Sequence, residues 1–239
     1  MNDLVDADLD RANGKKRPMP SGTVSKKQAW TFIMLTNSAA VLLSVATANI
    51  VSMIILAPML AIGIAYSAPK VALMNRFLLK NASISAFYML CALLGITSAY
   101  GADLATSNPS IPVYTMTVFG IMIFVGSIVN DLGDIKGDKE EGRRTVPIVI
   151  GGEKTIKVLT VMLAAVPAVS WAFYGLAGGH SIITTAAISI VAVLGIMRVT
   201  KMRKGLEDMD MEYMRKQHKK WFPLHMLMQS SVIVGALLA

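Results

Sequence analysis

Two clusters of Asn and Asp side chains recur along the chain at a spacing of four residues. Residues four apart on a helix share one face and lie about 5–6 Å from one another. Hard oxygen ligands suit Mg²⁺, which proteins usually hold through one or two carboxylates and the phosphates of a substrate. The pattern therefore predicts an Mg²⁺ site that can clamp a diphosphate and neutralise charge on a leaving group. The clusters are Asn2, Asp6 and Asp10, and Asn130, Asp134 and Asp138.

The two clusters also resemble each other as sequences. When Asn2 is aligned with Asn130, both stretches carry Asn, Asp, Leu, Asp and Asp at matching places, and a basic residue follows each, Arg11 and Lys139. Because the two stretches lie far apart in the chain, we interpret them as parts of two related halves rather than as a short tandem repeat.

Two simpler interpretations of the acidic residues have to be weighed. Carboxylates at helix ends are often solvated caps that the helix dipole favours, but a pair of clusters with equal spacing makes this less convincing. A calcium loop is the second interpretation, since Asp6, Asp8 and Asp10 match its first ligands. It fails because Arg11 stands where the loop needs Gly and Arg17 where it needs a bidentate Glu.

Long uncharged stretches must position these clusters. Only 16% of the residues are charged, whereas soluble chains carry about a quarter. Positions 28–69, 158–197 and 221–239 lack Asp, Glu, Lys and Arg, and positions 81–130 contain only Asp103. A membrane-spanning helix needs about 20 apolar residues. The chain is therefore predicted to be an all-α, polytopic membrane helix bundle with about seven transmembrane helices, over 28–47, 50–66, 81–101, 111–130, 154–175, 182–200 and 221–239.

The charged residues lie on one face of this predicted bundle. All 23 Lys and Arg residues, and every acidic residue except Asp103, fall in 1–27, 67–80, 131–157 and 198–220. The positive-inside rule assigns this face to the cytoplasm. We therefore expect an integral protein of the cell membrane with its active-site mouth on the cytoplasmic side. The net charge of +8 attracts anionic lipids or substrates and requires no nucleic acid.

Smaller features complete the expected architecture. Ser25 and Asn81 are predicted N-caps, and Trp30 and Trp221 are predicted anchors at the membrane interface. The basic segment 201–220 fits either a short amphipathic helix, a lid or a solvated loop, of which the loop is favoured.

With these residues the chain resembles the UbiA superfamily of intramembrane prenyltransferases. The resemblance covers the whole length as a single domain, 1–239, and Tyr66-Ser67-x-Pro69-Lys70 is similar to the Tyr…Lys element of that family. The two main motifs are Asn2-Asp3-x-x-Asp6-x-x-x-Asp10-Arg11-x-Asn13-x-x-x-Arg17-Pro18-x-Pro20-Ser21-Gly22 and Asn130-Asp131-x-x-Asp134-x-x-Gly137-Asp138-x-x-x-Gly142-x-x-Thr145-x-Pro147-x-x-x-Gly151.

The resemblance implies roles for individual residues. The catalytic carboxylates would be Asp6, Asp10, Asp134 and Asp138. The Mg²⁺ ligands would be Asn2, Asp6, Asp10, Asn130, Asp131, Asp134 and Asp138. Substrate-binding residues would be Arg17 and Lys70 on the diphosphate, with Tyr66, and Arg143 and Arg144 toward an acceptor phosphate.

The resemblance also implies a reaction. The second motif is similar to archaeal digeranylgeranylglyceryl phosphate synthases, which favours Mg²⁺-dependent transfer of a geranylgeranyl group to geranylgeranylglyceryl phosphate, forming an ether in membrane lipid biosynthesis. The first motif is shared with chlorophyll synthases, so an aromatic, quinone or chlorophyll-like acceptor is the alternative. A divalent-cation transporter is a third hypothesis, but carriers place ionisable residues near the bilayer midplane, and here they gather at one mouth.

The resemblance carries one departure. The superfamily has nine spans and carries its first aspartate motif at the end of the second, whereas here that motif follows Met1 directly. We therefore expect the chain to lack two N-terminal helices, which puts its activity as given in question. The oligomeric state is not predicted.

Overall fold

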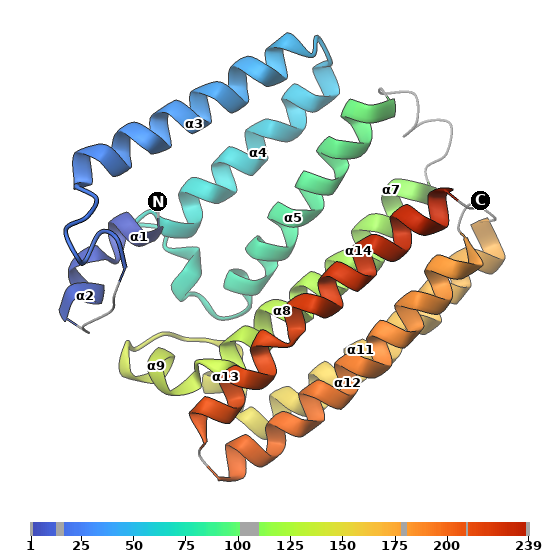
Figure 1. Cartoon of the computed structure of the whole chain (residues 1–239). Coiled ribbons are helices and arrows are strands. Elements are labelled where there is room, and N and C mark those ends of the chain that lie inside the picture. The colour runs from blue at the N-terminus through green and yellow to red at the C-terminus, as the bar shows by residue number, and fades with distance from the viewer. Residues whose placement is uncertain (1, 13–16, 101–109, 178–180, 209, 238–239) are drawn as a thin grey trace. The chain divides into compact units, whose positions relative to one another are not determined.

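The computed structural model describes residues 2–12, 17–100, 110–177, 181–208 and 210–237. Every regular element among them is helical, which confirms the predicted all-α class (Figure 1). The chain divides into two compact units. The first comprises Met1–Met74 and Leu90–Asp103, and the second Asn75–Met89 and Leu104–Ala239.

The first unit contains two long helices and two short ones. Ser25 caps α3 through a reciprocal capping box with Gln28, as predicted. Asn49 caps α4, and its amide donates to the carbonyl of Thr97 on the second half of α5 at 2.9 Å. The elements are α1 (Asn2–Val5), α2 (Ala7–Ala12), α3 (Lys26–Ala46), α4 (Ile50–Ser67) and the 3-10 turn η1 (Leu73–Asn75), with α5 (Phe77–Tyr100) shared between the units.

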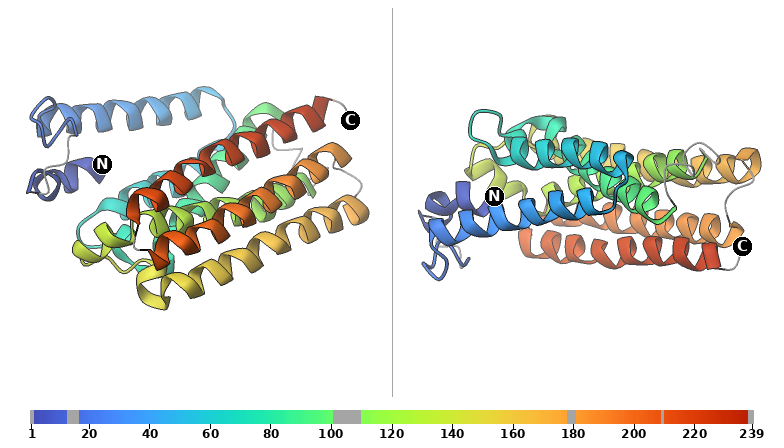
Figure 2. Two further views of the ribbon diagram at one scale, coloured as in Figure 1. Left: turned by 60° about the horizontal axis from the view of Figure 1, so that its bottom comes forward. Right: turned by 90° about the horizontal axis from the view of Figure 1, so that it is seen from above.

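The second unit is built around α8. Helices α11, α12 and α14 run alongside one another (Figure 2), and their buried apolar side chains form one core with α8. Within a membrane such a core is held mainly by close packing rather than by release of water. The elements are α7 (Ser110–Tyr114), the π-helical turn η2 (Thr115–Phe119), α8 (Gly120–Gly133), α9 (Ile135–Glu140), α10 (Val146–Ile150), α11 (Gly152–Ala177), α12 (Ile182–Glu207), α13 (Met211–Lys219) and α14 (Trp221–Leu237).

Trp221 belongs to this core, so its predicted place at the membrane interface is wrong. Its side chain is only 3% exposed. Gly126 on α8 leaves the room for it, since a Cβ atom there would lie 2.5 Å from the indole Nε1. Trp221 donates from Nε1 to His225 one turn later in α14, at 3.1 Å. Trp221 is thus a packing residue, whereas Trp30 on α3 is 47% exposed and its place at the interface stays a prediction.

Six helical stretches in the described part of the chain are long and apolar enough to cross a membrane. Five are α3, α4, α5, α11 and α12, and the sixth, Pro112–Gly133, runs through α7, η2 and α8. The seventh predicted span corresponds to α14, of which 17 residues are described. Two predicted boundaries need correction. α5 begins at Phe77, so that Asn81 lies inside its first turns rather than capping it, and α12 continues to Glu207. Charged residues limit the apolar part of a helix, but they do not end the helix itself.

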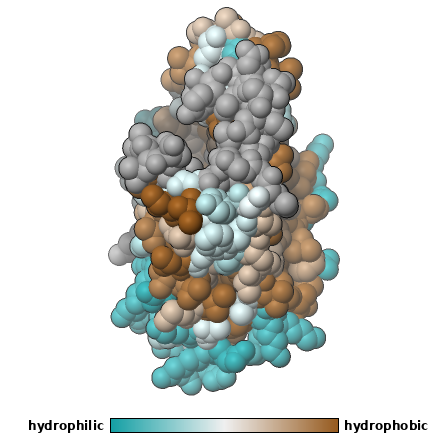
Figure 3. Space-filling view, turned by 90° about the vertical axis from the view of Figure 1, so that its right-hand side faces the viewer, coloured by the Kyte–Doolittle hydropathy of each residue, from teal (hydrophilic) through white to brown (hydrophobic). Residues whose placement is uncertain are grey.

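The segment that follows α12 is helical rather than a solvated loop. α13 is capped by Asp210, whose carboxylate accepts from the backbone N–H of Tyr213. It packs on α8, where His218 lies against Gly133, and on α12, where the buried Met214 lies against Gly205. Figure 3 shows hydrophilic side chains at the lower end of the view, where α12 and α13 meet in Figure 1, and apolar side chains above them.

Candidate functional site

Both acidic clusters adopt the same local backbone. The first aspartate of each four-residue pair, Asp6 or Asp134, interrupts the helix, and a six-residue helix follows, α2 or α9. The N–H of Asp10 donates to the carbonyl of Asp6 at 2.7 Å, and that of Asp138 to Asp134 at 2.9 Å. The continuous helical stripe expected from the spacing is therefore bent in both places, and the shared bend agrees with the proposed internal repeat.

In the first unit, Arg17 ties the acidic cluster together. Its Nη1 donates to Asp10 at 2.9 Å and to Asp3 at 3.0 Å. Asp10 is 1% exposed and Asp6 6%. Burial of charge is tolerated when the charge is paired, and Arg17 supplies that partner to the buried Asp10. Asn2 lies in α1, and its side chain is outside the described residues.

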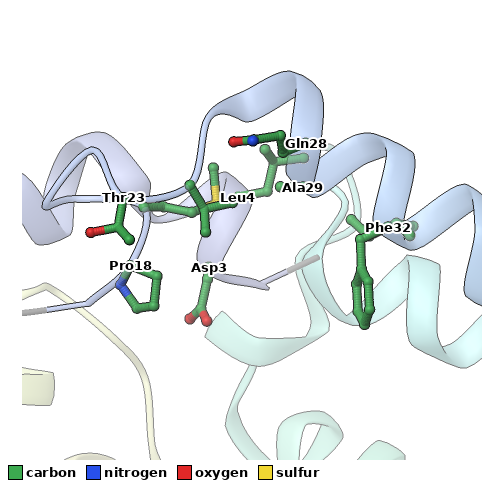
Figure 4. A pocket seen from close by; sticks show the side chains of 10 residues that line it. Asp3, Leu4, Pro18, Thr23, Gln28, Ala29 and Phe32 are labelled. Atoms are coloured by element: carbon green, nitrogen blue, oxygen red, sulfur yellow. The ribbon is translucent and has the colours of Figure 1, made fainter.

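The edge of this cluster is more exposed. Asp8 is bonded by the ammonium of Lys26 at 3.1 Å and by Arg11 at 3.3 Å. The hydrogen bond and charge of Lys26 lower the pKa of Asp8. Asp3 of this cluster lies in the wall of a cleft of about 520 Å³ whose other lining side chains are mainly apolar (Figure 4). This unit therefore combines carboxylates with an apolar recess.

In the second unit, Asp131 is fully buried and has a partner on each carboxylate oxygen. The ammonium of Lys80 donates to Oδ1. The amide of Asn81 donates to Oδ2 at 3.0 Å, and also to the hydroxyl of Ser127 at 3.0 Å. Lys80 and Asn81 belong to the first turns of α5, so this network joins α5 to the end of α8.

Asp138 has fewer hydrogen-bond partners in the described part of the chain than Asp131. It is 6% exposed, and its Oδ2 has no hydrogen-bond partner among the described residues. The nearest guanidinium nitrogen, on Arg143, lies 3.8 Å from Oδ1, while Arg143 pairs more closely with Glu141 at 2.8 Å. Burial raises the pKa of Asp138, since it outweighs the charge of Lys80. The site thus offers a buried carboxylate oxygen with unused bonding capacity.

Asp134 lies between these two aspartates and is half exposed. Arg215 of α13 donates to its Oδ1 at 2.9 and 3.2 Å. His218 of the same helix packs where Gly133 leaves room. Burial lowers the pKa of His218, while Asp134 and Asp131 raise it. α13 therefore lies directly against the acidic end of α8.

A hard divalent cation fits this donor set. The unpartnered oxygen of Asp138 and the accessible carboxylate of Asp134 are oxygen ligands of the kind that Mg²⁺ prefers. Within the described ranges, three His, Cys, Asp or Glu side chains are nowhere grouped closely enough to enclose a metal by themselves. A cation here would therefore depend on further ligands, such as water or phosphate oxygens.

The other predicted site residues are less engaged. Lys70 is exposed in the turn after α4, and Tyr66 is half buried at the end of that helix. Asn130 is half buried in the last turn of α8, and Arg144 is exposed. Their predicted roles stay predictions.

An apolar cavity lies next to the π-helical turn of the second unit. Its volume is about 350 Å³, and its walls include Met89, Met116 and Met162. Gly120, also in its wall, lets the Met89 side chain approach closely, because a Cβ atom there would lie 2.5 Å from the sulfur of Met89. Flexible methionines adapt to irregular apolar ligands, so the cavity is suited to a hydrocarbon chain.

The sequence analysis missed three residues that hold the aspartates, namely Lys80, Asn81 and Arg215. The sequence did contain a hint of the first two, since Lys80 and Asn81 stand at the beginning of an otherwise uncharged span. Arg215 lies in a basic segment without a distinguishing pattern, and only the packing of α13 on α8 identifies it.

Comparison with known proteins gives a family match. The UbiA prenyltransferase family matches residues 1–219. Digeranylgeranylglyceryl phosphate synthase of Natronomonas pharaonis is 30% identical over 158 residues, which are 66% of this chain and 53% of that protein. The enzyme of the same name from Methanosphaera stadtmanae is 26% identical over 224 residues, 92% of this chain and 75% of its own. The chain thus spans between about half and three quarters of these relatives.

Other relatives share the fold or part of the sequence. Chlorophyll synthase of Arabidopsis thaliana is 27% identical over 202 residues, 80% of this chain and 49% of that protein. A solved structure from a study of digeranylgeranylglyceryl phosphate synthase in membranes is 24% identical, with a TM-score of 0.72, and covers all of this chain and 80% of its own. A UbiA homologue from Archaeoglobus fulgidus bound to Cd²⁺ is 14% identical, with a TM-score of 0.68, covering 95% and 80%. These structures establish the membrane helix-bundle fold.

Proposed function

Because this chain belongs to the UbiA prenyltransferase family, we propose that it transfers a prenyl group from an isoprenoid diphosphate to a lipid-like acceptor within the membrane. The prenyl group is geranylgeranyl, the acceptor is geranylgeranylglyceryl phosphate and the product is an ether lipid precursor. Two of the relatives above, which carry the name digeranylgeranylglyceryl phosphate synthase, support this choice. The active-site mouth lies on the cytoplasmic face of the cell membrane, as the distribution of basic residues supports.

The unsatisfied oxygen of Asp138 is the observation that carries the proposal. A buried carboxylate oxygen without a hydrogen-bond partner lowers the stability of the fold. Asp138 carries such an oxygen in the second acidic cluster, whose backbone repeats that of the first. A divalent cation removes that cost. Asp134 and Asp138 would hold Mg²⁺ in the second unit, and Asp6 and Asp10 in the first. When bound, Mg²⁺ neutralises negative charge on the departing diphosphate.

The chain's own residues then have distinct tasks. Arg17 would contact the diphosphate, a role that its contacts with the carboxylates of Asp3 and Asp10 support. Lys70 is exposed and free to extend toward phosphate oxygens. The apolar cavity beside Met89 and Met116 takes hydrocarbon of the prenyl chain. Loss of diphosphate leaves an allylic cation, and a hydroxyl oxygen of the acceptor forms the new carbon–oxygen bond while its proton is released.

Mass analysis of products tests the reaction. Membranes that contain the chain would receive geranylgeranyl diphosphate, geranylgeranylglyceryl phosphate and Mg²⁺, with a chelator as control. We expect a digeranylgeranyl ether that disappears with the chelator. Asp6→Ala and Asp134→Ala should each abolish its formation while the protein stays inserted and folded. Normal turnover in both variants would remove the metal-clamp argument.

The similarity to chlorophyll synthase favours a second candidate acceptor. A chlorophyll-like, aromatic or quinone acceptor would receive the prenyl group in that case. The same assay, with such acceptors supplied, distinguishes the two, because a prenylated product of that class with no glycerol ether would select the second candidate.

A further inference from the structure

Lys80 is an ammonium group inside the acidic cluster of the second unit. It is 6% exposed, and it donates to Oδ1 of Asp131, which has no exposed surface. Asn81, the next residue of α5, donates to Oδ2. Two consecutive residues of one helix therefore satisfy both oxygens of a carboxylate on another, and α5 is held against the end of α8 by this contact.

These contacts leave Asp131 poorly suited to bind a metal. A divalent cation would have to displace the ammonium from a buried position where Lys80 could not regain the hydration it lost on burial. The positive charge of Lys80 also repels a second cation at short range, where a low local dielectric strengthens the repulsion. Lys80 thus occupies the place that a metal would need.

Asp134 and Asp138 differ from Asp131 in just these respects. Oδ2 of Asp138 lacks a hydrogen-bond partner within the described part of the chain. Asp134 has a side chain that is 52% exposed, and its partner Arg215 is itself 59% exposed and able to swing away. A cation can therefore bind Oδ2 of Asp138 and the carboxylate of Asp134 without displacing a buried ammonium group.

We propose that Lys80 is the resident counter-cation of Asp131, and that this pairing removes Asp131 from the metal-ligand set, so that the second unit binds its divalent cation through Asp134 and Asp138. Lys80 is a positioning residue in this arrangement, because it acts through Asp131 and the junction of α5 with α8. The inference rests on the proposed function in one respect, the presence of a divalent-cation site in this unit.

Mn²⁺ binding tests the proposal without requiring turnover. The full chain would be purified in detergent and titrated with Mn²⁺ in the presence of inorganic diphosphate, with free Mn²⁺ measured by electron paramagnetic resonance. The decisive variant is Lys80→Met with Asp131→Leu, which removes both charges. Replacing a buried pair by apolar residues of similar volume is often tolerated. We expect its Mn²⁺ Kd to stay within about threefold of wild type, whereas the control Asp138→Asn weakens binding at least about tenfold.

Single changes at Lys80 separate this role from a merely structural one. Lys80→Arg keeps the charge and should bind Mn²⁺ as wild type does. Lys80→Met leaves the carboxylate of Asp131 without its counter-cation, and we expect tighter Mn²⁺ binding or one additional bound ion. A purely structural role predicts unchanged or weaker binding, which overturns the proposal. This variant also decides the question if the double variant does not fold.

The outcomes separate this inference from the proposed function. If the wild-type chain binds no Mn²⁺, both this inference and the metal part of the proposed function are overturned. If the wild-type chain binds Mn²⁺ and the folded double variant loses at least about tenfold in affinity, as expected for a lost ligand, only this inference is overturned, because Asp131 then belongs to the ligand set.

Discussion

Replacing Asp138 by Asn should separate stability from function. This carboxylate lies among the attractive charges of Lys80 and Arg143 and the repulsive charges of Asp131 and Asp134, and burial raises its pKa. The net environment therefore disfavours the ionised form. Asn has the same shape and no charge, and an unpaired buried group costs about 1–3 kcal/mol. Because the amide also needs partners, we expect Asp138→Asn to be as stable as wild type or more stable by up to about 2 kcal/mol.

The same change should remove the stabilisation of the folded protein by bound metal, and with it the turnover that depends on metal. A ligand that binds only the folded state stabilises it by about 2.7 kcal/mol at 100 times its Kd. We expect Mg²⁺ with diphosphate to raise the Tm of wild type and to leave that of Asp138→Asn nearly unchanged. Turnover should fall at least about 100-fold, as it does when one electrostatic contact to developing charge is lost.

Thermal unfolding in detergent, with chelator or with Mg²⁺ and diphosphate, measures both effects alongside the product assay. Glu140→Gln is the matched control, since Glu140 is exposed on the same helix α9 and surface changes usually stay within about 0.5 kcal/mol. A metal-free Asp138→Asn protein that is less stable than wild type by more than about 1 kcal/mol would refute the reasoning, because its carboxylate would then be a structural contact. Full turnover by the variant would refute it as well.

Three further changes probe other contacts. Arg17→Gln should raise the KM for the prenyl diphosphate by about tenfold, as loss of one charged contact implies, and steady-state kinetics with an unchanged KM would contradict its role. Gly126→Ala should destabilise the protein by about 1–3 kcal/mol, because the new Cβ would clash with Trp221. Gly175→Ala is the control, since no other described atom lies within 4 Å of the Cβ it would add. Equal Tm values for the two variants would disprove the clash. Burial lowers the pKa of His218, so the folded protein favours the neutral ring. The folded state should therefore be fully stable above the ordinary pKa of 6.5 and lose stability as the pH falls from there through the folded pKa. His218→Gln should flatten the dependence of Tm on pH below about 6.5, and an unaltered slope would show that His218 does not cause it.

The sequence alone determined the helices and the chemistry of the clusters. Long uncharged stretches could only be apolar helices, and the described spans lie close to the predicted ranges. The equal spacing of Asp6 with Asp10 and of Asp134 with Asp138 predicted a repeated element, and the same helix, bend and helix is present in both. These features are local, since they depend on residues within one or a few helical turns of one another.

The tertiary structure decided which charges meet. Lys80, Asn81 and Arg215 reach their aspartates across 51, 50 and 81 positions of the chain, respectively, and no local pattern marks such partners. The buried place of Trp221 likewise depends on a glycine in another helix. Spacing along a helix sets the direction of a side chain, but burial and pairing depend on the helix packed opposite. For that reason the aspartates could be predicted as a group, while the difference between the paired Asp131 and the unsatisfied Asp138 arises only when α5, α8 and α9 come together.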